Sequence, residues 1–315
     1  STVDMVPTET PVALTAQGSY LISGGLSGFG LSTARWLAAQ GARHLVLVGR
    51  RGAATPEAQD ALADLRAAGV HVEAVAVDVS DAGQVEALIR RFGSEWPRLH
   101  GVVHAAMVLR DGPMLGLTTD QIQSVLRPKV DGAWNLHRFT LGQPLDFFVC
   151  YSSLSALVGN RDQANYAAAN EYLETLCRHR RANGLPPMSI SWGAIADIGY
   201  VARDEGVRDV LRRQGAFDLK LEQAWIALSH GLRAGVFQHG LIRALGEYRR
   251  IFHRRDRDRH RGRRLAGHLA VEGVVGEAVA AIGVRVRGVA EAAVGVQRRR
   301  AACRTAHQLR RDRVG

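Results

Sequence analysis

The stretch that decides the fold is Ser19-Tyr20-Leu21-Ile22-Ser23-Gly24-Gly25-Leu26-Ser27-Gly28-Phe29-Gly30. Residues 19–22 have the composition of a buried strand, the glycines form a tight turn, and residues 29–40 follow as a helix that stops at Gly41. Such a turn lets the backbone approach a phosphate, which the free N–H groups and dipole of the helix N-terminus attract. The stretch therefore predicts a nucleotide-binding turn at the start of an α/β fold.

Apolar segments and helical segments alternate along the chain as far as residue 192. We expect further strands at residues 44–48, 70–77, 99–105, 147–151 and 188–192. We expect helices at residues 56–69, 81–92, 118–140 with a break at Pro128, and 163–181. Continuous apolar strands separated by helices indicate a parallel sheet covered on both faces. The predicted fold class is α/β, a doubly wound parallel sheet of the dinucleotide-binding (Rossmann) type.

Charge divides the chain into two parts. The 315 residues have a formal net charge of +11. Residues 1–248 contain 23 Lys and Arg against 24 Asp and Glu, whereas residues 249–315 contain 18 Arg against six acids. A nucleic-acid-binding domain would carry excess positive charge on its own surface. The balanced charge of residues 1–248 argues against that function, so we expect no nucleic-acid partner.

Residues 249–315 form an Arg/Gly/Ala-rich tail with few large apolar side chains to fill a core. Phe252 is its only aromatic residue, and none of its basic residues is Lys. Three interpretations stay open: an out-of-frame, non-native end from a GC-rich gene, a native disordered linker, or an Arg-rich segment that binds nucleic acid or a membrane surface. We place a domain boundary near residue 248 and interpret residues 1–17 as a linker.

Cysteine usage and hydropathy indicate in which cellular location the protein is expected. Cys150, Cys177 and Cys303 give neither a disulfide framework nor metal-ligand spacing, so we expect no metal. No apolar run reaches the roughly 18–20 residues that a membrane-spanning helix needs. Residues 1–16 show no signal-peptide pattern. We therefore expect a reducing, cytoplasmic location.

The residues suited to catalysis are Lys129, Ser153, Tyr166 and Asn170. Reduction of a carbonyl builds negative charge on its oxygen, so the site must supply a proton and hydrogen-bond donors. Tyr166 is the candidate acid, and Ser153, thirteen residues earlier, is the candidate donor to the substrate oxygen. The ammonium of Lys129 can lower the pKa of a nearby phenol. Asn170 follows Tyr166 by one helical turn and can hold a water and position Lys129.

A common NAD(P)H-dependent reductase design has Lys four residues after Tyr, where this chain has Asn170. The exchange of Lys and Asn, together with the segments 151–153 and 163–170, resembles the ketoreductase domains of modular and iterative polyketide synthases. These domains are a branch of the short-chain dehydrogenase/reductases, and synthases of the actinobacterial and mycobacterial type are the expected context. The resemblance runs from about residue 18 to about residue 245. It implies an NADPH-dependent ketoreductase domain over residues 18–248 whose catalytic tetrad is the set of four residues above.

The resemblance extends to the phosphate-binding turn. Gly24, Gly28 and Gly30 have the spacing of the short-chain reductase loop, and Gly25 lies beside them. The family usually has Gly where Ser27 stands, a departure that would tighten the loop without abolishing binding.

Cofactor selectivity is determined at the end of the second strand. An acid there would hold a ribose 2′-hydroxyl, whereas Arg50 suits a 2′-phosphate and predicts NADPH. Two pairs of residues further along resemble the adenine contact and the loop that lines the cofactor: Asp78 with Val79, and His104 with Ala105. Taken alone, Asp78 fits a helix N-terminal residue equally well, and His104 a packed core histidine.

Two positions resemble the stereochemical markers of the family. Leu109-Arg110-Asp111 is similar to the Leu-Asp-Asp triplet of one product class, with Arg110 as a departure. Val158 stands where the other class has Trp. These positions favour the Leu-Asp-Asp class, with Asp111 as the substrate-side residue. Residues 194–215 would form a glycine-containing lid over the substrate.

The resemblance also implies partners. The expected substrate is a β-ketoacyl chain on the phosphopantetheine arm of an acyl carrier protein, and the catalytic half is expected to pair with a preceding structural half that this sequence lacks. The chain thus looks like a piece of a larger synthase. Three alternatives stay open: a free-standing short-chain reductase of small ketones, an inactive truncated synthase fragment, and a basic fragment that binds nucleic acid.

Overall fold

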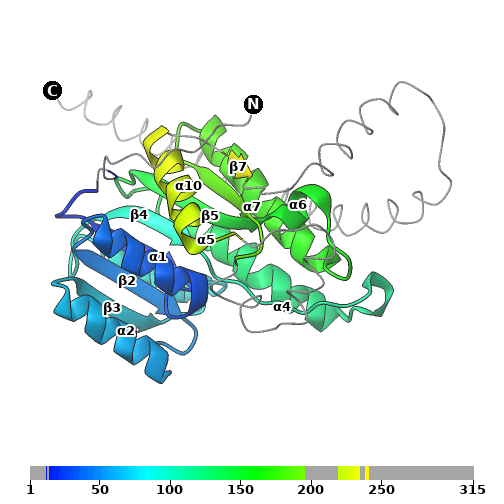
Figure 1. The fold of residues 1–315 in the computed structure, drawn as a ribbon, viewed down its shortest axis with the longest axis horizontal. Coiled ribbons are helices and arrows are strands. Elements are labelled where there is room, and N and C mark those ends of the chain that lie inside the picture. Colours follow the sequence, from blue (N-terminus) through cyan, green and yellow to red (C-terminus); the bar gives the residue numbers. More distant parts are fainter. Residues whose placement is uncertain (1–11, 13, 196–218, 235–237, 241–315) are drawn as a thin grey trace, which may run out of the picture. The chain divides into compact units, whose positions relative to one another are not determined.

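The computed structural model describes residue 12 and residues 14–195, 219–234 and 238–240 (Figure 1). Its centre is a parallel sheet with the order β3-β2-β1-β4-β5-β6-β7. The strands are β1 (Ser19–Ser23), β2 (His44–Gly49), β3 (His71–Ala76), β4 (Leu99–His104), β5 (Phe147–Ser153), β6 (Met188–Trp192) and β7 (Gln238–Gly240). The chain winds from β1 out to β3 and then returns to β4 on the other side of β1, so the direction of winding changes between β1 and β4.

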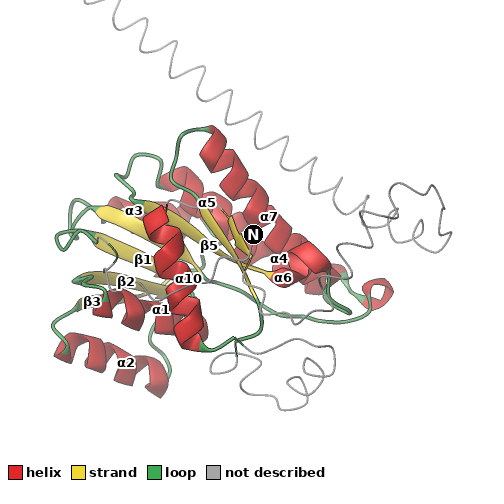
Figure 2. Ribbon diagram, turned by 45° about the horizontal axis from the view of Figure 1, so that its top comes forward, coloured by secondary structure: helices red, strands yellow, loops and turns green. Residues whose placement is uncertain are grey.

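Helices cover both faces of the sheet (Figure 2). One face carries α1 (Gly28–Ala39), α2 (Pro56–Ala67) and α10 (Leu221–Ala234). The other carries α3 (Ala82–Arg90), α5 (Asp131–Phe139) and α7 (Ala164–Ala182). Three shorter or peripheral elements complete the described part: η1 (Met114–Gly116), α4 (Thr119–Lys129) and α6 (Leu154–Val158). The predicted fold class is confirmed.

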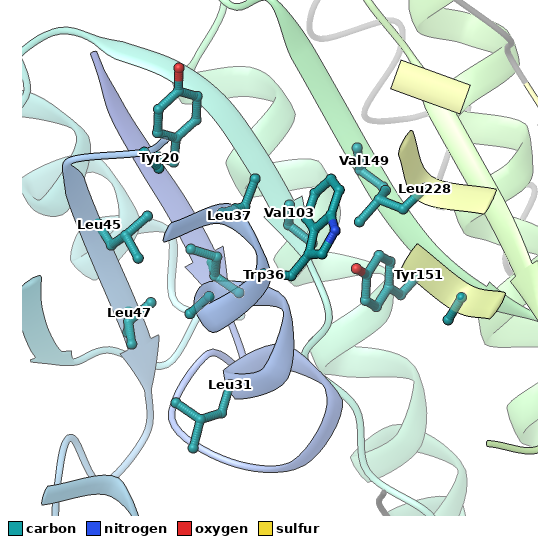
Figure 3. Packing of buried hydrophobic residues seen from close by; sticks show 14 of the residues in the cluster. Tyr20, Leu31, Trp36, Leu37, Leu45, Leu47, Val103, Val149, Tyr151 and Leu228 are labelled. Carbon is teal, nitrogen blue, oxygen red and sulfur yellow. The ribbon is translucent and has the colours of Figure 1, made fainter. Parts of the chain in front are cut away.

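The core has two layers because alternate residues of each strand point to opposite faces. Tyr151 of β5 packs in the layer below α1 and α10, together with Trp36 and Leu228 (Figure 3). Its neighbour Cys150 packs in the layer below α7, with Leu173. Burial on both faces explains why these strands have continuous rather than alternating apolar patterns.

Local capping fixes where several helices begin. Thr55 accepts a hydrogen bond from the Ala58 N–H, and Pro56 occupies the first helical position of α2. Thr118 and Gln121 form a reciprocal capping box at the start of α4. Asp81 caps α3 by accepting from two backbone N–H groups. These caps satisfy donors that the first helical turn leaves free.

Most of the expected elements agree with the structure to within one or two residues, and the helical break expected at Pro128 lies at Val130, between α4 and α5. Helix α4 continues through Pro128 to Lys129, and the Val130 N–H still donates to the Leu126 carbonyl at 2.6 Å. The chain then starts α5 at Asp131. Pro128 has no N–H to donate to the carbonyl one turn earlier, which weakens the helix at this point, and α4 ends one residue later. Helices α6 and α10 and strand β7 were not predicted.

Several expectations fall outside the described residues. These are most of the linker 1–17, nearly all of the lid 194–215, the boundary near residue 248 and the tail 249–315. Within the described ranges, no helix is long and apolar enough to cross a membrane. In the same part of the chain, no group of three His, Cys, Asp or Glu side chains is placed to hold a metal ion.

Candidate active site

The site lies where the winding direction of the sheet changes. Ser23 ends β1 and is in register with His104, which ends β4. The Ala105 N–H donates to the Ser23 carbonyl at 3.0 Å, and the Gly24 N–H donates to the Val48 carbonyl at 2.8 Å. In open α/β sheets, ligands bind in the crevice at the carboxyl ends of the strands at such a point.

The glycine turn between β1 and α1 is built for close backbone approach. Gly24 has φ +70°, and a Cβ on it would lie 2.9 Å from the backbone of Ala106. A Cβ on Gly30 would lie 2.2 Å from the Gly24 carbonyl oxygen. Both positions therefore require glycine. Ser27 has an extended backbone with φ −161°, so a serine is accommodated where the family usually has Gly.

The N-terminus of α1 faces this turn with unused donors. Ser27 is the N-cap residue, and its side chain makes no capping hydrogen bond in the described structure. Gly28 is the first residue of α1, and Gly25 lies in the turn before it. The first-turn N–H groups of α1 thus remain available to an anion. Together with the tight turn, this cradle fits the pyrophosphate of a dinucleotide.

The predicted selectivity and adenine residues occupy the neighbouring strand ends. Arg50 directly follows β2 and is exposed. The Asp78 carboxylate accepts from both the N–H and the hydroxyl of Ser80, at 2.9 and 2.7 Å. The N-cap of α3 is Asp81, not Asp78. The Val79 carbonyl accepts from the Asn135 amide at 3.0 Å, which holds this loop against α5.

His104 is wholly buried, and its Nδ1 lies 2.6 Å from the Ser23 hydroxyl. Burial, aided by the nearby charge of Lys129, lowers the pKa of His104 to about 3. The imidazole is therefore neutral at neutral pH and ties the ends of β1 and β4 together. Any contact of residues 104–105 with a cofactor must come from their backbone or from Ala105.

Lys129 ends α4 and reaches the end of β5. It is 2% exposed, and its Nζ donates to the Tyr151 carbonyl at 2.8 Å. Burial lowers the pKa of Lys129 from 10.5 to about 8. A group with that pKa still carries its proton at neutral pH, so a positive charge is held below the surface.

Of the other three predicted catalytic residues, Tyr166 lies near this ammonium. Its Nζ lies 5.5 Å from the centre of the Tyr166 ring. Burial raises the pKa of Tyr166, while hydrogen bonds with Asn170 and Ser153 oppose the rise and Asp111 adds to it. Asn170 also donates to the Tyr166 carbonyl at 2.8 Å. Lys129 comes from α4, Tyr166 and Asn170 come from α7, and Ser153 is the last residue of β5.

Asp111 lies in a loop that is fastened to the segment before α7. The Gln163 amide donates to the Asp111 carboxylate at 2.7 Å, and the Asn165 amide donates to the Arg110 carbonyl at 2.8 Å. A third bond joins the Gly112 N–H to the Asp162 carbonyl at 2.7 Å. This clamp fixes Asp111 relative to the start of the helix that carries Tyr166.

The sequence reasoning missed one buried carboxylate beside these residues. Glu174 is 1% exposed and accepts hydrogen bonds from the hydroxyls of Ser152 and Ser191. It follows Asn170 by four residues and Tyr166 by eight, so it lies on the same side of α7. That spacing was the available signal, because an acid on the inner face of a helix needs a partner.

The geometry agrees with the comparisons to known proteins. The family model for the KR domain matches residues 18–197. This chain is a KR domain, the ketoreductase of polyketide synthases. It is 43% identical over 212 residues, 67% of the chain, to highly-reducing polyketide synthase 1 of Aureobasidium melanogenum. It is 44% identical over 212 residues, 66% of the chain, to a phenolphthiocerol synthesis polyketide synthase of type I from Mycobacterium marinum.

Solved ketoreductase structures have the same fold. An A-type ketoreductase from a modular polyketide synthase is 39% identical, with a TM-score of 0.69 over 75% of this chain and 48% of that one. The first ketoreductase of the tylosin synthase is 34% identical, with a TM-score of 0.66 over 72% of this chain and 49% of that one. The ketoreductase chain spans only 10% of the length of each of the two synthases named above. The predicted family is confirmed, and with it an oxidoreductase.

Proposed function

We propose that this ketoreductase reduces a β-ketoacyl thioester, carried by an acyl carrier protein, to the β-hydroxyacyl thioester with NADPH. The observation that supports it best is the meeting of Lys129, Ser153, Tyr166 and Asn170 at one strand end. Two of these residues come from α7, one from α4 and one from β5. Their convergence next to a dinucleotide cradle is what carbonyl reduction requires.

The residues present fit NADPH. Gly24 and Gly30 let the backbone of the turn pack closely, and the N-terminus of α1 offers donors for the pyrophosphate. Arg50 would pair with the 2′-phosphate, and Asp78 and Val79 would contact the adenine. The backbone of residues 104–105 would line the nicotinamide side. When bound, NADPH supplies the hydride.

The residues of the protein then donate the proton and stabilise the negative charge that develops. Tyr166 donates its phenolic proton to the substrate oxygen, and Ser153 donates a hydrogen bond to the same oxygen. The Lys129 charge stabilises the phenolate that forms, at a distance that the low dielectric of the interior makes effective. The Asn170 side-chain oxygen is buried without a protein partner in the described part of the chain. It would hold a water that returns the proton.

The proposed substrate is supported by the relatives and by the hydrogen bonds that fix the Asp111 loop. The relatives are large synthases, which supports a carrier-bound substrate presented by other domains, including the structural half expected to pair with this one. Asp111, fixed by Gln163, would contact the substrate on its entry side and bias the product toward the Leu-Asp-Asp class.

The test is NADPH oxidation with a β-ketoacyl N-acetylcysteamine thioester, using the full chain and its Tyr166→Phe variant. Circular dichroism first shows that both proteins are folded. We expect turnover in the parent, loss of about 100-fold or more in Tyr166→Phe because the proton donor is gone, and little turnover with NADH. A folded parent that binds NADPH but never oxidises it with this thioester or with a carrier-bound one would overturn the proposal.

A further inference from the structure

Glu174 is a carboxylate buried in the middle of α7, between that helix and the sheet. Its side chain is 1% exposed. Acidic side chains are seldom buried to this extent unless they are paired, because the desolvation of a carboxylate is costly. Two hydroxyls compensate here: Ser191 donates at 2.6 Å and Ser152 at 3.1 Å, both to Oε1.

The two serines come from neighbouring strands. Ser152 belongs to β5 and Ser191 to β6, and the two residues are paired in the register of the sheet. Both are buried, at 3% and 0% exposure. One carboxylate oxygen therefore joins α7 to two strands at the same level of the sheet, and it does so inside the core, where water does not compete.

The contact of Glu174 with Ser152 and Ser191 lies close in sequence to the catalytic residues, both on β5 and on α7. Ser152 directly precedes Ser153, and its hydroxyl also lies 3.3 Å from the Asn170 carbonyl. On the helix, Glu174 is one turn beyond Asn170 and two turns beyond Tyr166. On the strand, Tyr151 directly precedes Ser152 and accepts from Lys129. A shift of α7 along β5 would thus change the distances of Tyr166 and Asn170 from Ser153 and Lys129 together.

We propose that Glu174 is a positioning residue of the reductase, which holds Tyr166 and Asn170 of α7 at the correct distance from Ser153 and Lys129 by binding Ser152 and Ser191. The inference rests on the proposed function. Glu174 itself touches neither substrate nor cofactor in this assignment. Its effect is exerted through the helix, and small displacements matter because reactivity falls steeply with misplacement of about 1 Å.

The pH dependence of Tyr166 reports this positioning. Among the residues that the structure describes, the charged groups near Tyr166 are Lys129, from α4, and Asp111, from the loop after β4. Hydrogen bonds with Ser153 and Asn170 lower the pKa of Tyr166. If α7 moves away from β5, the bond between Tyr166 and Ser153 lengthens and the phenol pKa rises. Because Tyr166 must be protonated to act as the acid, the alkaline limb of the rate profile should move to higher pH.

The experiment compares four variants of the full chain with the parent. Glu174→Ala removes the acceptor, Ser191→Ala removes the shorter of the two bonds, and Glu174→Gln keeps an acceptor oxygen in place. Glu171→Ala is the matched control, because Glu171 lies on the exposed side of the same helix and pairs with Arg178. Each protein is measured for thermal unfolding, NADPH affinity, and kcat and KM of thioester reduction between about pH 6 and pH 10.

We expect Glu174→Ala to lower kcat by about 10- to 100-fold, as for a misplacement near 1 Å, with NADPH affinity unchanged. Its alkaline limb should move upward. Ser191→Ala should show the same shift with a smaller loss, Glu174→Gln should restore the parent profile, and Glu171→Ala should leave everything unchanged. If Glu174→Ala does not fold, Ser191→Ala and Glu174→Gln carry the comparison.

Two results would overturn the inference. One is a normal kcat in a folded Glu174→Ala or Ser191→Ala variant; the other is a lower kcat with an unmoved pH profile, which indicates a merely structural role. A parent that turns over no thioester contradicts the proposed function instead. In that case the phenol pKa of Tyr166, read by ultraviolet titration against Tyr166→Phe, decides whether Glu174 sets the environment of Tyr166: a rise in Ser191→Ala supports the positioning, and no change rejects it.

Discussion

The Lys129 ammonium lies 5.5 Å from the centre of the Tyr166 ring while it donates to the Tyr151 carbonyl. The charge comes from α4 and the phenol from α7. A lysine one turn after the tyrosine would be positioned by a single helix. In this ketoreductase the spacing depends instead on how two helices pack against β5, so contacts remote from the reacting atoms influence it.

Replacing Lys129 by Met should remove a pH-dependent part of the stability. Burial lowers the pKa of Lys129 from 10.5 to about 8. Between these values the folded chain has released the proton and the unfolded chain still holds it, so the free energy of unfolding rises with pH across this window. We expect the urea midpoint of the parent to rise relative to that of Lys129→Met as the pH increases from about 8 to about 10. A constant difference between the two midpoints would contradict the buried charge.

Replacing Arg50 by Ala should weaken NADPH binding and leave NADH binding nearly unchanged. A charge-assisted hydrogen bond contributes about 1.5–3 kcal/mol, which corresponds to roughly a 10- to 100-fold loss of NADPH affinity. Fluorescence titration with both cofactors measures the effect. Arg51→Ala is the control, since Arg51 is the adjacent exposed arginine. An equal loss in both variants would show that general positive charge, and not Arg50, selects the phosphate.

Two glycines of the cofactor turn should differ sharply in their tolerance of Ala. A Cβ on Gly30 would lie 2.2 Å from the Gly24 carbonyl oxygen, whereas a Cβ on Gly28 meets nothing within 4 Å. Gly28 has φ +50°, so Gly28→Ala incurs only the cost of a left-handed residue, about 1–2 kcal/mol. We expect Gly30→Ala to be more destabilised in urea and to lose NADPH binding. Comparable behaviour of the two variants would mean that the turn relaxes readily.

The contact between α5 and the loop after β3 offers a double-mutant test. A Cβ on Gly132 would lie 2.7 Å from a methyl group of Val79. Gly132→Ala should therefore destabilise the domain, and Val79→Ala should make room for the added methyl. We expect the loss in the double variant to be smaller than the sum of the single losses by about 0.5–3 kcal/mol, as for residues in contact. Additive losses would show that the two residues do not meet in solution.

The sequence supported the sheet, the cofactor turn and the four catalytic candidates, because each depends on local pattern or on fixed spacing. Continuous apolar runs identified the strands, and the glycines identified the turn before α1. The roles of Lys129, Ser153, Tyr166 and Asn170 stay predictions. What the structure adds is that Lys129, remote in sequence, reaches Tyr166 through the end of β5.

The features that were not predicted depend on contacts between distant segments. The bond from Gln163 to Asp111 joins two loops, and no periodicity reports it. Helix α6 has five residues, too few to show an amphipathic pattern. Glu174 could have been found by its spacing from Tyr166, but its partners Ser152 and Ser191 look like ordinary strand residues until β5 and β6 are paired.

The alternation of faces along β5 limits how this domain can change in length. Tyr151 points into the layer of α1 and α10, and Cys150 into the layer of α7. Because the side-chain period of a strand is two, deleting or inserting one residue within β5 would exchange the two faces. Ser152 would then turn away from Glu174, and a large ring would point at α7. The carboxyl end of β5 should therefore accept substitutions far more readily than it accepts a change in residue number.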